Sequence, residues 1–429
     1  MNRVCLTLPT NRACPATITA LHAEAAYAVR TFGVEVELLV LDSAGPGDRA
    51  AHARTVAALP AEPGVRVHHL DEEAQRDLLG RVIREAGLPG PDRFLRLMLP
   101  SAVSYGACTN RAFLLAAALG CDSVHRRDSD STYQLHAGQP VFPIHHELPW
   151  LGRPAADATA AGARTDLDPA LAHRPVSLAG ASFIGELSVD IAEIRRLDET
   201  VYQDVVSLWA PGDWPEDRKR ELVEESFTGA GTAPFTGDHA TLTLVDPMRV
   251  DMCNVAFDRA VYERVPLPPA TDTIGSDYFL LHLVHDAGLP GILHNRHIEN
   301  FHTPERRTDT GFPAYQRRFV KFLLSMLYFH HVYDRMAAEG AGLLDGGQRV
   351  RPERIVEFLR ESTALPRDEN VWRLDRVDTA YRKLGGRYTA FADRLAAERQ
   401  ELLDRAEQDI DAFATLTQAW PALVEAARR

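Results

Sequence analysis

The chain has few cysteines, and none of their spacings builds a zinc ribbon or a disulfide framework. Five cysteines are scattered over 429 residues, and no two of them form a CxxC pair. An odd number of isolated cysteines argues against a disulfide-stapled secreted domain and against a structural zinc site. The sequence therefore favours a reducing compartment, and we expect the protein to be cytoplasmic.

Long apolar runs and an excess of positive charge are also missing. No uninterrupted apolar stretch approaches the roughly 20 residues that span a bilayer, and the N-terminal apolar run is interrupted at Pro9. The 47 basic residues are outnumbered by 60 acidic residues, which gives a net charge of -13. This balance argues against nucleic-acid binding and against a membrane-surface protein, but it allows a local basic pocket for an anionic ligand.

Strand-like and helix-like segments alternate over the first 131 residues. Apolar runs predict three strands, over residues 4–8, 34–41 and 65–70. Helical spacing predicts three helices, over residues 15–32, 71–86 and 106–119, with Asp71 as an N-cap. Strand, helix and strand in this order form the unit of a parallel sheet, whose ligands bind at the carboxyl ends of the strands. We therefore expect a Rossmann-like mixed α/β sheet with helices on both faces.

The rest of the chain divides by composition into three parts. Residues 151–180 lack periodicity and predict a loop or flexible insertion. Residues 181–312 are again mixed α/β, with a strand expected over residues 183–194 and a mobile loop over residues 227–238. Residues 313–429 predict a C-terminal helical region, with helices expected over residues 315–336, 354–359 and 375–423. We expect this region to pack on the α/β domain of residues 1–312 or to mediate assembly of a homo-oligomer.

Two aspartates one residue apart follow the predicted helix of residues 106–119. In an extended chain, residues i and i+2 point to the same face, so Asp128 and Asp130 could place two carboxylates beside one cation. Mg²⁺ and Mn²⁺ prefer such oxygen ligands, and substrate phosphates commonly complete their coordination. The alternative is a turn, because Asp and Ser side chains bond to nearby backbone. Arg126 and Arg127 directly precede the acids, and either an ion pair with a carboxylate or phosphate or a solvated charge pair is expected there.

Four stretches in order carry a resemblance to a known family. They are Leu6–Arg12, Leu38–Ser43, the segment from Thr109-Asn110-Arg111 to Asp128-Ser129-Asp130, and the segment from Cys253–Tyr262 through Gly275–Leu283 to Phe301-His302. Together they resemble the GT-A fold glycosyltransferases, closest in layout to the family-2-like enzymes. In that family the first three contain a nucleotide-contacting loop, a base-facing Asp and a metal-binding DxD motif. The resemblance therefore implies a GT-A type sheet, with a nucleotide-binding half over about residues 1–131 and an acceptor half over about residues 181–312.

The resemblance also implies a role for each matching residue. Those expected to contact the nucleotide are Pro9, Thr10, Asn11, Arg12, Asp42, Arg111 and Asp128. Asp128 and Asp130 would hold Mn²⁺ or Mg²⁺, and His302 would ligate the metal or face the diphosphate. Asp277 would remove the proton from the acceptor hydroxyl, although Ser276 stands where the family has Glu. An N-terminal helix position, favoured by the helix dipole, is the structural alternative for Asp277.

The function expected from these roles is metal-dependent transfer of a sugar from a nucleotide-sugar donor. A UDP-sugar is the expected donor and a GDP-sugar the alternative, while the acceptor is left open among small molecules, glycans and polypeptides. An inverting outcome follows only if Asp277 is the base, so a retaining outcome stays open. The rivals are a nucleotidyltransferase and a degenerate transferase that acts as a binding or scaffold protein. The nucleotidyltransferase is disfavoured because residues 8–14 contain no glycine for a phosphate-binding loop.

Overall fold

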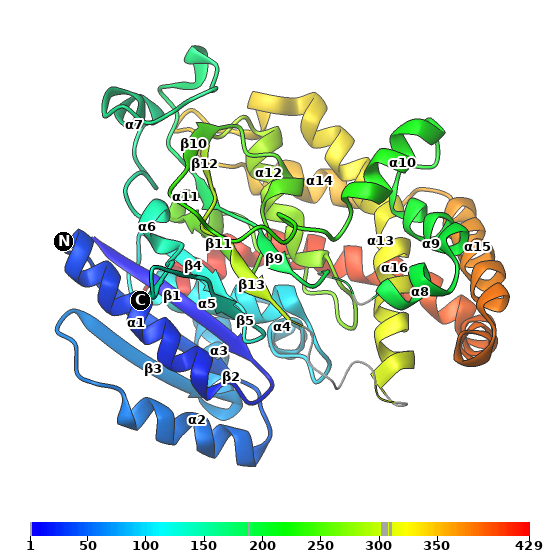
Figure 1. The fold of residues 1–429 in the computed structure, drawn as a ribbon, viewed down its shortest axis with the longest axis horizontal. Helices are drawn as coiled ribbons and strands as arrows, with labels where there is room; N and C mark the ends of the chain where they lie inside the picture. Colours follow the sequence, from blue (N-terminus) through cyan, green and yellow to red (C-terminus); the bar gives the residue numbers. More distant parts are fainter. Residues whose placement is uncertain (1, 188, 190, 302–307, 309–310) are drawn as a thin grey trace.

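An eight-stranded mixed sheet forms the centre of the molecule (Figure 1). The computed structural model describes residues 2–187, 189, 191–301, 308 and 311–429. In sheet order the strands are β10 (Ala240–Thr243), β12 (Gly291–His294), β8 (Leu178–Gly180), β11 (Asn254–Asp258), β4 (Ser123–Arg127), β1 (Arg3–Thr10), β2 (Glu35–Asp42) and β3 (Val65–Asp71). Strands β1 to β4 are mutually parallel, whereas β11 runs antiparallel to both its neighbours. The predicted mixed α/β sheet is thus confirmed.

Helices cover both faces of this sheet because side chains on both faces are apolar. Leu6 and Leu8 of β1 pack with Ile18 of α1, while Cys5 of β1 belongs to the larger core that contains Phe113 of α5. The helices of the α/β part are α1 (Pro15–Phe32), α2 (Pro46–Ala58), α3 (Glu72–Glu85), α4 (Pro91–Met98), α5 (Tyr105–Ala118), α6 (Ile144–Glu147), α7 (Ala155–Ala160), α8 (Ala192–Leu197), α9 (Glu199–Val206), α10 (Glu216–Glu225), α11 (Arg259–Tyr262) and α12 (Phe279–Asp286). The predicted N-cap is present, since the Asp71 carboxylate accepts from the amide of Ala74 at the start of α3.

Residues 151–180 are more ordered than their composition predicted. They contain α7, a 3₁₀ turn (Pro169–Leu171) and the strand β8, which lies between β11 and β12 near the middle of the sheet. The prediction of a flexible insertion is therefore wrong for the end of this segment. Strand β8 was missed because it is too short to show the two-residue period of a strand. The strand expected over residues 183–194 is also shorter, since β9 (Phe183–Gly185) ends before α8 begins.

Two small sheets and several 3₁₀ turns surround the ends of the main strands. One sheet joins β5 (Ser131–Tyr133), β13 (Ile298–Asn300) and β9, and the other pairs β6 (Leu135–His136) with β7 (Gln139–Pro140). The remaining 3₁₀ turns are Ser207–Trp209, Pro247–Arg249, Ser276–Tyr278 and Gly340–Leu343. Because β5 follows β4 so closely, the segment Asp128–Asp130 is held between two strands.

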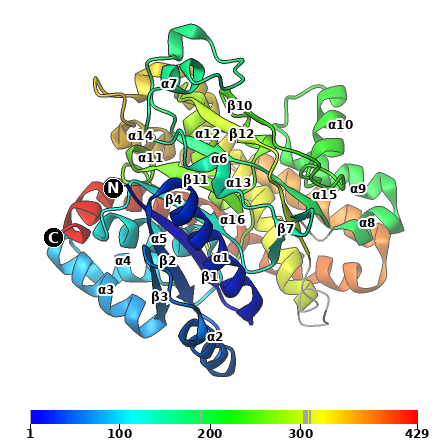
Figure 2. The ribbon, with the colours of Figure 1, turned by 60° about the vertical axis from the view of Figure 1, so that its left-hand side comes forward.

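The C-terminal helices are α13 (Gly311–Glu339), α14 (Pro352–Ser362), α15 (Asp368–Leu384) and α16 (Gly386–Ala427). In Figures 1 and 2, α16 runs from α15 back across the molecule toward the α/β part. It packs there on α3 and α5, and the Trp420 indole donates to the Tyr262 carbonyl over 2.9 Å. The helix expected over residues 375–423 is instead two helices, divided at Gly385, whose φ of 73° favours glycine. The predicted domain boundary at residue 312 and the self-association of these helices stay predictions.

The cysteines and the helices also bear on the expectations from composition. All five cysteines are unpaired in the structure. Within the described ranges, no helix combines the length and the apolar character that a membrane span requires.

Candidate active site

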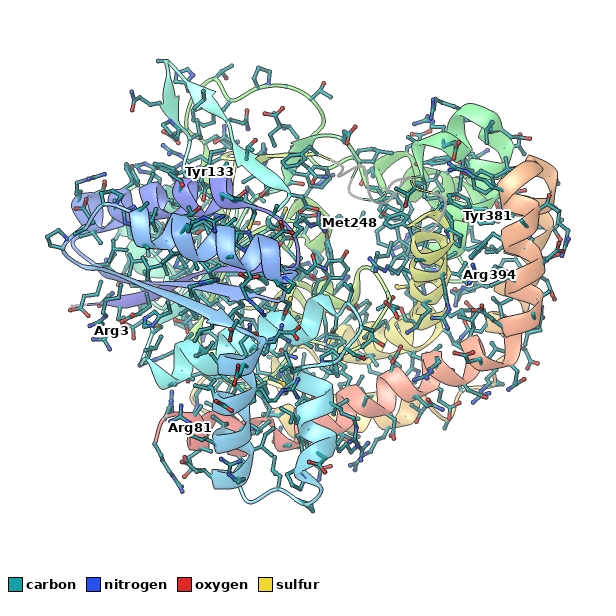
Figure 3. The ribbon with its side chains drawn as sticks, turned by 90° about the horizontal axis from the view of Figure 1, so that it is seen from below. Arg3, Arg81, Tyr133, Met248, Tyr381 and Arg394 are labelled. Carbon is teal, nitrogen blue, oxygen red and sulfur yellow. The ribbon has the colours of Figure 1, made fainter. Side chains whose placement is uncertain are left out.

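A cavity of about 420 Å³ lies at the carboxyl ends of β1, β2 and β4. Its volume is in the range of small-molecule sites, and this edge of a parallel sheet is where such sites form. The predicted residues that line it are Pro9, Thr10, Asn11, Arg12, Arg111, Asp128, Asp130 and Asp277. Met248 also lines it, and Figure 3 shows this residue between the N-terminal α/β half and the C-terminal helices. Segments more than 100 residues apart thus meet in one site.

Arg126 is the centre of the site's charge network. Its Nη1 donates to Oδ2 of Asp277 over 2.7 Å, and its Nε donates to Oδ1 of Asp128 over 3.0 Å. The arginine side chain is 3% exposed and that of Asp277 is 6% exposed. Burial by itself would lower the pKa of Arg126, but the two carboxylates raise it well above its ordinary value. The guanidinium therefore stays charged and couples the end of β4 to the turn that carries Asp277.

Asp128 lies in an excess of negative charge. Burial raises the pKa of its carboxyl group to about 6, while Arg126 lowers the pKa and Asp130, Asp277 and Asp251 raise it further. The Ser131 hydroxyl donates to the Asp128 carbonyl over 2.9 Å, so the expected turn chemistry is present as well. A turn and a carboxylate cluster therefore coexist at this position.

Asp130 faces the loop that follows β1. The Arg12 Nη1 donates to Oδ2 of Asp130 over 2.8 Å. The loop is shaped by Thr10, whose hydroxyl donates to the Arg12 carbonyl and accepts from the Arg12 amide. This arrangement brings the first and third family-like stretches into direct contact.

Asp277 lies in a 3₁₀ turn, Ser276–Tyr278, that leads directly into α12. The turn begins at Gly275, whose φ is 70°, and a Cβ atom at Gly275 would lie 2.8 Å from the ring of Phe322. A side chain at residue 275 would therefore be both strained and crowded. The glycine lets the Asp277 turn pack closely against α13.

Asp251 and Tyr278 belong to the site but were not predicted. The Tyr278 hydroxyl donates to Oδ2 of Asp251, and the Cys253 amide donates to Oδ1 over 2.9 Å. Both residues line the cavity. Asp251 precedes β11 without a recognisable motif, so no sequence signal distinguishes it from an ordinary loop acid.

Arg111 lines the cavity but its guanidinium is held by neutral oxygens. Its Nε donates to Oε1 of Gln75 over 2.7 Å, and its Nη1 donates to the carbonyl of Met98 over 2.6 Å. Burial lowers the pKa of Arg111. The buried Arg111 guanidinium is positioned where it could donate to a phosphate oxygen or to another oxygen acceptor.

Asp42 is placed differently from the prediction. Its side chain is fully buried and does not line the cavity, although Leu41 and Ser43 do. Asp42 Oδ2 lies 2.9 Å from Nδ1 of His52 and 2.7 Å from Nε2 of His69. Burial alone would raise the pKa of Asp42, but these two histidines lower it to about 2. Both histidines thus lie within hydrogen-bond distance of the Asp42 carboxylate, and a contact between this carboxylate and a nucleobase stays a prediction.

Two further groups among the described residues have the spacing of metal ligands, and both lie outside the cavity lining. They are Asp42 with His52 and His69, and His145 and His146 with Asp238. In the first, the His52 Nε2 already accepts from the Cys14 amide, so both of its ring nitrogens are occupied. The predicted ligand His302 lies outside the described residues.

The mixed sheet, with acids at the end of β4 and a cavity at its carboxyl edge, places the chain among the α/β proteins whose sites lie at the ends of parallel strands. Within that class the chain belongs to the family described as "Family of unknown function (DUF6271)", whose model matches residues 2–429. No curated protein matches the chain.

Several solved structures are similar to the chain. One is glucosyl-3-phosphoglycerate synthase from Mycobacterium tuberculosis with Mn²⁺, UDP-glucose and phosphoglyceric acid, at 17% identity and a TM-score of 0.37, covering 76% of this chain and 79% of that one. Another is the mannosyltransferase PcManGT from Pyrobaculum calidifontis with GDP-Man and Mn²⁺, at 13% identity and a TM-score of 0.37, covering 97% and 86%. A third is S. aureus TarS 1-349, at 12% identity and a TM-score of 0.34, covering 98% and 91%.

Proposed function

We propose that the protein is a metal-dependent glycosyltransferase that takes a sugar from a nucleotide-sugar donor. The observation that supports this most directly is the meeting of three distant segments in one cavity. These are the loop at Thr10–Arg12, the acids at Asp128–Asp130 and the turn at Asp277, joined through Arg126 and Arg12. This combination offers one place for a diphosphate and an adjacent acid for the acceptor hydroxyl.

The acids at the end of β4 fit a divalent cation. Asp128 and Asp130 supply the hard oxygen ligands that Mg²⁺ and Mn²⁺ prefer, and the neighbouring carboxylates of Asp251 and Asp277 leave negative charge that a cation would neutralise. When bound, Mn²⁺ or Mg²⁺ would act as a Lewis acid that stabilises the leaving diphosphate. His302 remains a proposed further ligand.

The chain's own residues would divide the remaining work between donor and acceptor. Arg12 and Arg111 line the donor side and would attract the diphosphate, with Pro9, Thr10 and Asn11 positioning the nucleotide. Asp277 would accept the proton of the acceptor hydroxyl as its oxygen bonds to the sugar and the sugar–phosphate bond breaks. Arg126 would orient the Asp277 carboxylate through its 2.7 Å contact. Direct attack of this kind gives an inverted product.

Nucleotide binding provides the first test. A ligand that binds only the folded state raises its melting temperature, so we expect UDP to stabilise the protein more with Mn²⁺ than without it. GDP in parallel distinguishes the expected donor class from its alternative. The Asp130→Asn variant should lose the Mn²⁺-dependent part of the shift. Asp122→Asn is a matched control, because Asp122 precedes the same strand and pairs on the surface with Arg259.

The other outcomes of this experiment support other functions. Stabilisation by nucleoside triphosphates, with release of pyrophosphate, would instead support a nucleotidyltransferase. If no nucleotide stabilises the wild-type chain with or without Mn²⁺, the transferase proposal is wrong and a binding or scaffold role is favoured.

A further inference from the structure

The two sides of the cavity differ in chemistry. The donor side presents polar and charged groups such as Asn11, Arg12, Ser43 and Arg111. The side beyond Asp277 is lined mainly by aromatic and thioether side chains, among them Trp209, Phe227, Met248, Met252, Phe322 and Met326. Aromatic rings and methionine are suited to binding apolar ligands, because they offer a large contact area and, for methionine, an adaptable shape.

Three aromatic rings make a continuous wall on the apolar side. The rings of Trp209 and Phe227 are stacked, with centroids 5.3 Å apart and an interplanar angle of 15°. Phe322 lies against Trp209 at 5.6 Å. Phe227 has a φ of 65°, which is a strained conformation for a bulky residue. Such strain at a cavity wall is more typical of a functional position than of an ordinary loop.

This aromatic wall adjoins the proposed base. Phe322 packs against Gly275 so closely that an added Cβ atom would lie 2.8 Å from its ring, and Gly275 is two residues before Asp277. A planar ligand on the wall would therefore place a ring substituent near the Asp277 carboxylate.

Charge on the apolar side disfavours an anionic ligand. Its acidic lining residues are Glu225, Asp251 and Asp277. Arg126 is already paired with Asp277. Arg318 lies 4.0 Å from Asp272, and its buried Nε has no hydrogen-bond partner among the described residues. An acceptor with a phosphate or carboxylate would thus meet three acids and one weakly paired cation, and its desolvation would be poorly compensated.

We infer that the acceptor is an uncharged aromatic compound that carries a hydroxyl group. This inference rests on the proposed function and narrows it, because it selects the acceptor from the small molecules, glycans and polypeptides left open by the sequence. The ring stacks on the wall of Trp209, Phe227 and Phe322, and the hydroxyl group faces Asp277.

A pair of matched probes tests this specificity. 2-Naphthol and 6-hydroxy-2-naphthoate share the fused ring and the hydroxyl, and only the second carries a negative charge. Calorimetric titration of the full chain with UDP and Mn²⁺ present should show 2-naphthol binding about tenfold or more tightly than the naphthoate, a difference that corresponds to about 1.4 kcal/mol. Equal affinity, or tighter binding of the naphthoate, would overturn the inference.

Variants of the wall sharpen this test. Trp209→Ala should weaken 2-naphthol binding about tenfold, whereas Trp372→Ala should not, because Trp372 is 45% exposed on α15 and does not line the cavity. Met248→Lys places a cation on the apolar side and should shift the preference toward the naphthoate. The Met248→Lys variant keeps the inference testable if Trp209→Ala fails to fold. The proposed site is refuted if Met248→Lys keeps the wild-type preference for 2-naphthol over the naphthoate and a folded Trp209→Ala keeps the wild-type affinity for 2-naphthol. The probe would then bind outside the aromatic wall.

The thermal-shift experiment separates failure of the inference from failure of the proposed function. If UDP stabilises the protein but 2-naphthol does not bind, the transferase proposal stands and the aromatic acceptor is wrong. If 2-naphthol binds at the wall but no nucleotide binds, the transferase proposal is wrong. The apolar side is then a binding site for uncharged aromatic compounds without a donor.

Discussion

Two consecutive arginines at the end of β4 serve opposite faces of the sheet. Arg126 points into the cavity and contacts Asp128 and Asp277. Arg127 points toward α1 and α6, where its Nη2 lies 2.9 Å from both Glu24 and Glu147. Successive side chains of a strand alternate between faces, so the same residue type enters two different environments. One cluster borders a cavity and the other is enclosed.

The difference between the two clusters separates a structural network from a candidate site. Around Arg127 the acids are met by several donors, since Glu24 also accepts from Tyr133 and from the Ile144 amide, and Glu147 lies 2.6 Å from His125. Burial alone would raise the pKa of Glu147, but Arg127 and His125 lower it to about 2. Burial raises the pKa of Asp128 to about 6 instead, and the carboxylates of Asp130, Asp277 and Asp251 add to this effect. The enclosed cluster supports the fold, whereas the acids of the cavity border space that a ligand could enter.

The largest expected effect is on the enclosed cluster. Arg127→Met removes the cation between Glu24 and Glu147 and leaves two buried acids without it. Breaking a buried ion pair in this way costs about 3–5 kcal/mol, so the free energy of unfolding in a urea titration should fall by that amount. Adding Glu147→Gln to Arg127→Met should restore part of the loss. A stability change below 1 kcal/mol would show that the Arg127 cluster is not a structural centre.

The second-largest expected effect is a loss of the sugar-transfer rate on mutation of a cavity residue. Asp277→Asn keeps the shape of the side chain but cannot accept the hydroxyl proton, so sugar transfer should slow by about 100-fold or more. Mn²⁺-dependent stabilisation by UDP should persist, because Asp277 is assigned to the acceptor. The measurement is the transfer rate at saturating donor, with the donor chosen by thermal shift. A variant that retains near wild-type rate would remove Asp277 from the base role.

The two clusters should also respond to pH in opposite directions. A raised pKa means that the folded chain binds the proton of Asp128 more tightly than the unfolded chain, whose value is near 3.8. This contribution to stability is present below pH 4 and is lost as the pH rises through about 6. For Glu147 the pKa is lowered from 4.5, so its contribution is present above pH 4.5 and is lost as the pH falls toward 2.

Unfolding titrations of two variants across this pH range check these opposite responses. With divalent ions removed, Asp128→Asn should be more stable than the wild type at pH 7 and should approach it near pH 4. Glu147→Gln should be less stable than the wild type at pH 7 and should approach it at low pH. If the stabilities of both variants follow the same pH profile, the proposed difference between the Asp128 cluster and the Glu147 cluster is wrong.

Local patterns in the sequence predicted the fold better than the site. Strands β1 to β3 and helices α1, α3 and α5 were predicted because apolar side chains repeat at the strand and helix periods, whereas α2 and α4 were not predicted. Strand β8 was not predicted either, because Leu178-Ala179-Gly180 is too short to show a period and is fixed by pairing with β11 and β12. The break between α15 and α16 was missed although two adjacent glycines, Gly385 and Gly386, mark it.

At the site, the resemblance identified the contributing segments but not their contacts. Asp128, Asp130 and Asp277 line one cavity, and their roles there stay predictions. The pairing of Arg126 with Asp277 joins residues 151 positions apart, and neither spacing nor motif specifies it. Asp42 ends β2 as expected, but two histidines from different elements occupy its carboxylate. Such partners are set by tertiary packing, which local periodicity does not encode.

The smallest expected stability effect belongs to the ion pair at the rim of the cavity. Arg12 and Asp130 are 30% and 15% exposed, unlike the buried pair of Arg127 and Glu24. Water and salt screen a pair at this exposure, so Asp130→Asn should change the free energy of unfolding by less than about 1 kcal/mol. The same variant should abolish Mn²⁺-dependent stabilisation by UDP, because Asp130 is the proposed metal ligand. A large loss of stability with an intact Mn²⁺ effect would contradict the assignment of Asp130 as a metal ligand. Asp130 would then be a structural partner of Arg12, and other oxygens would bind the metal.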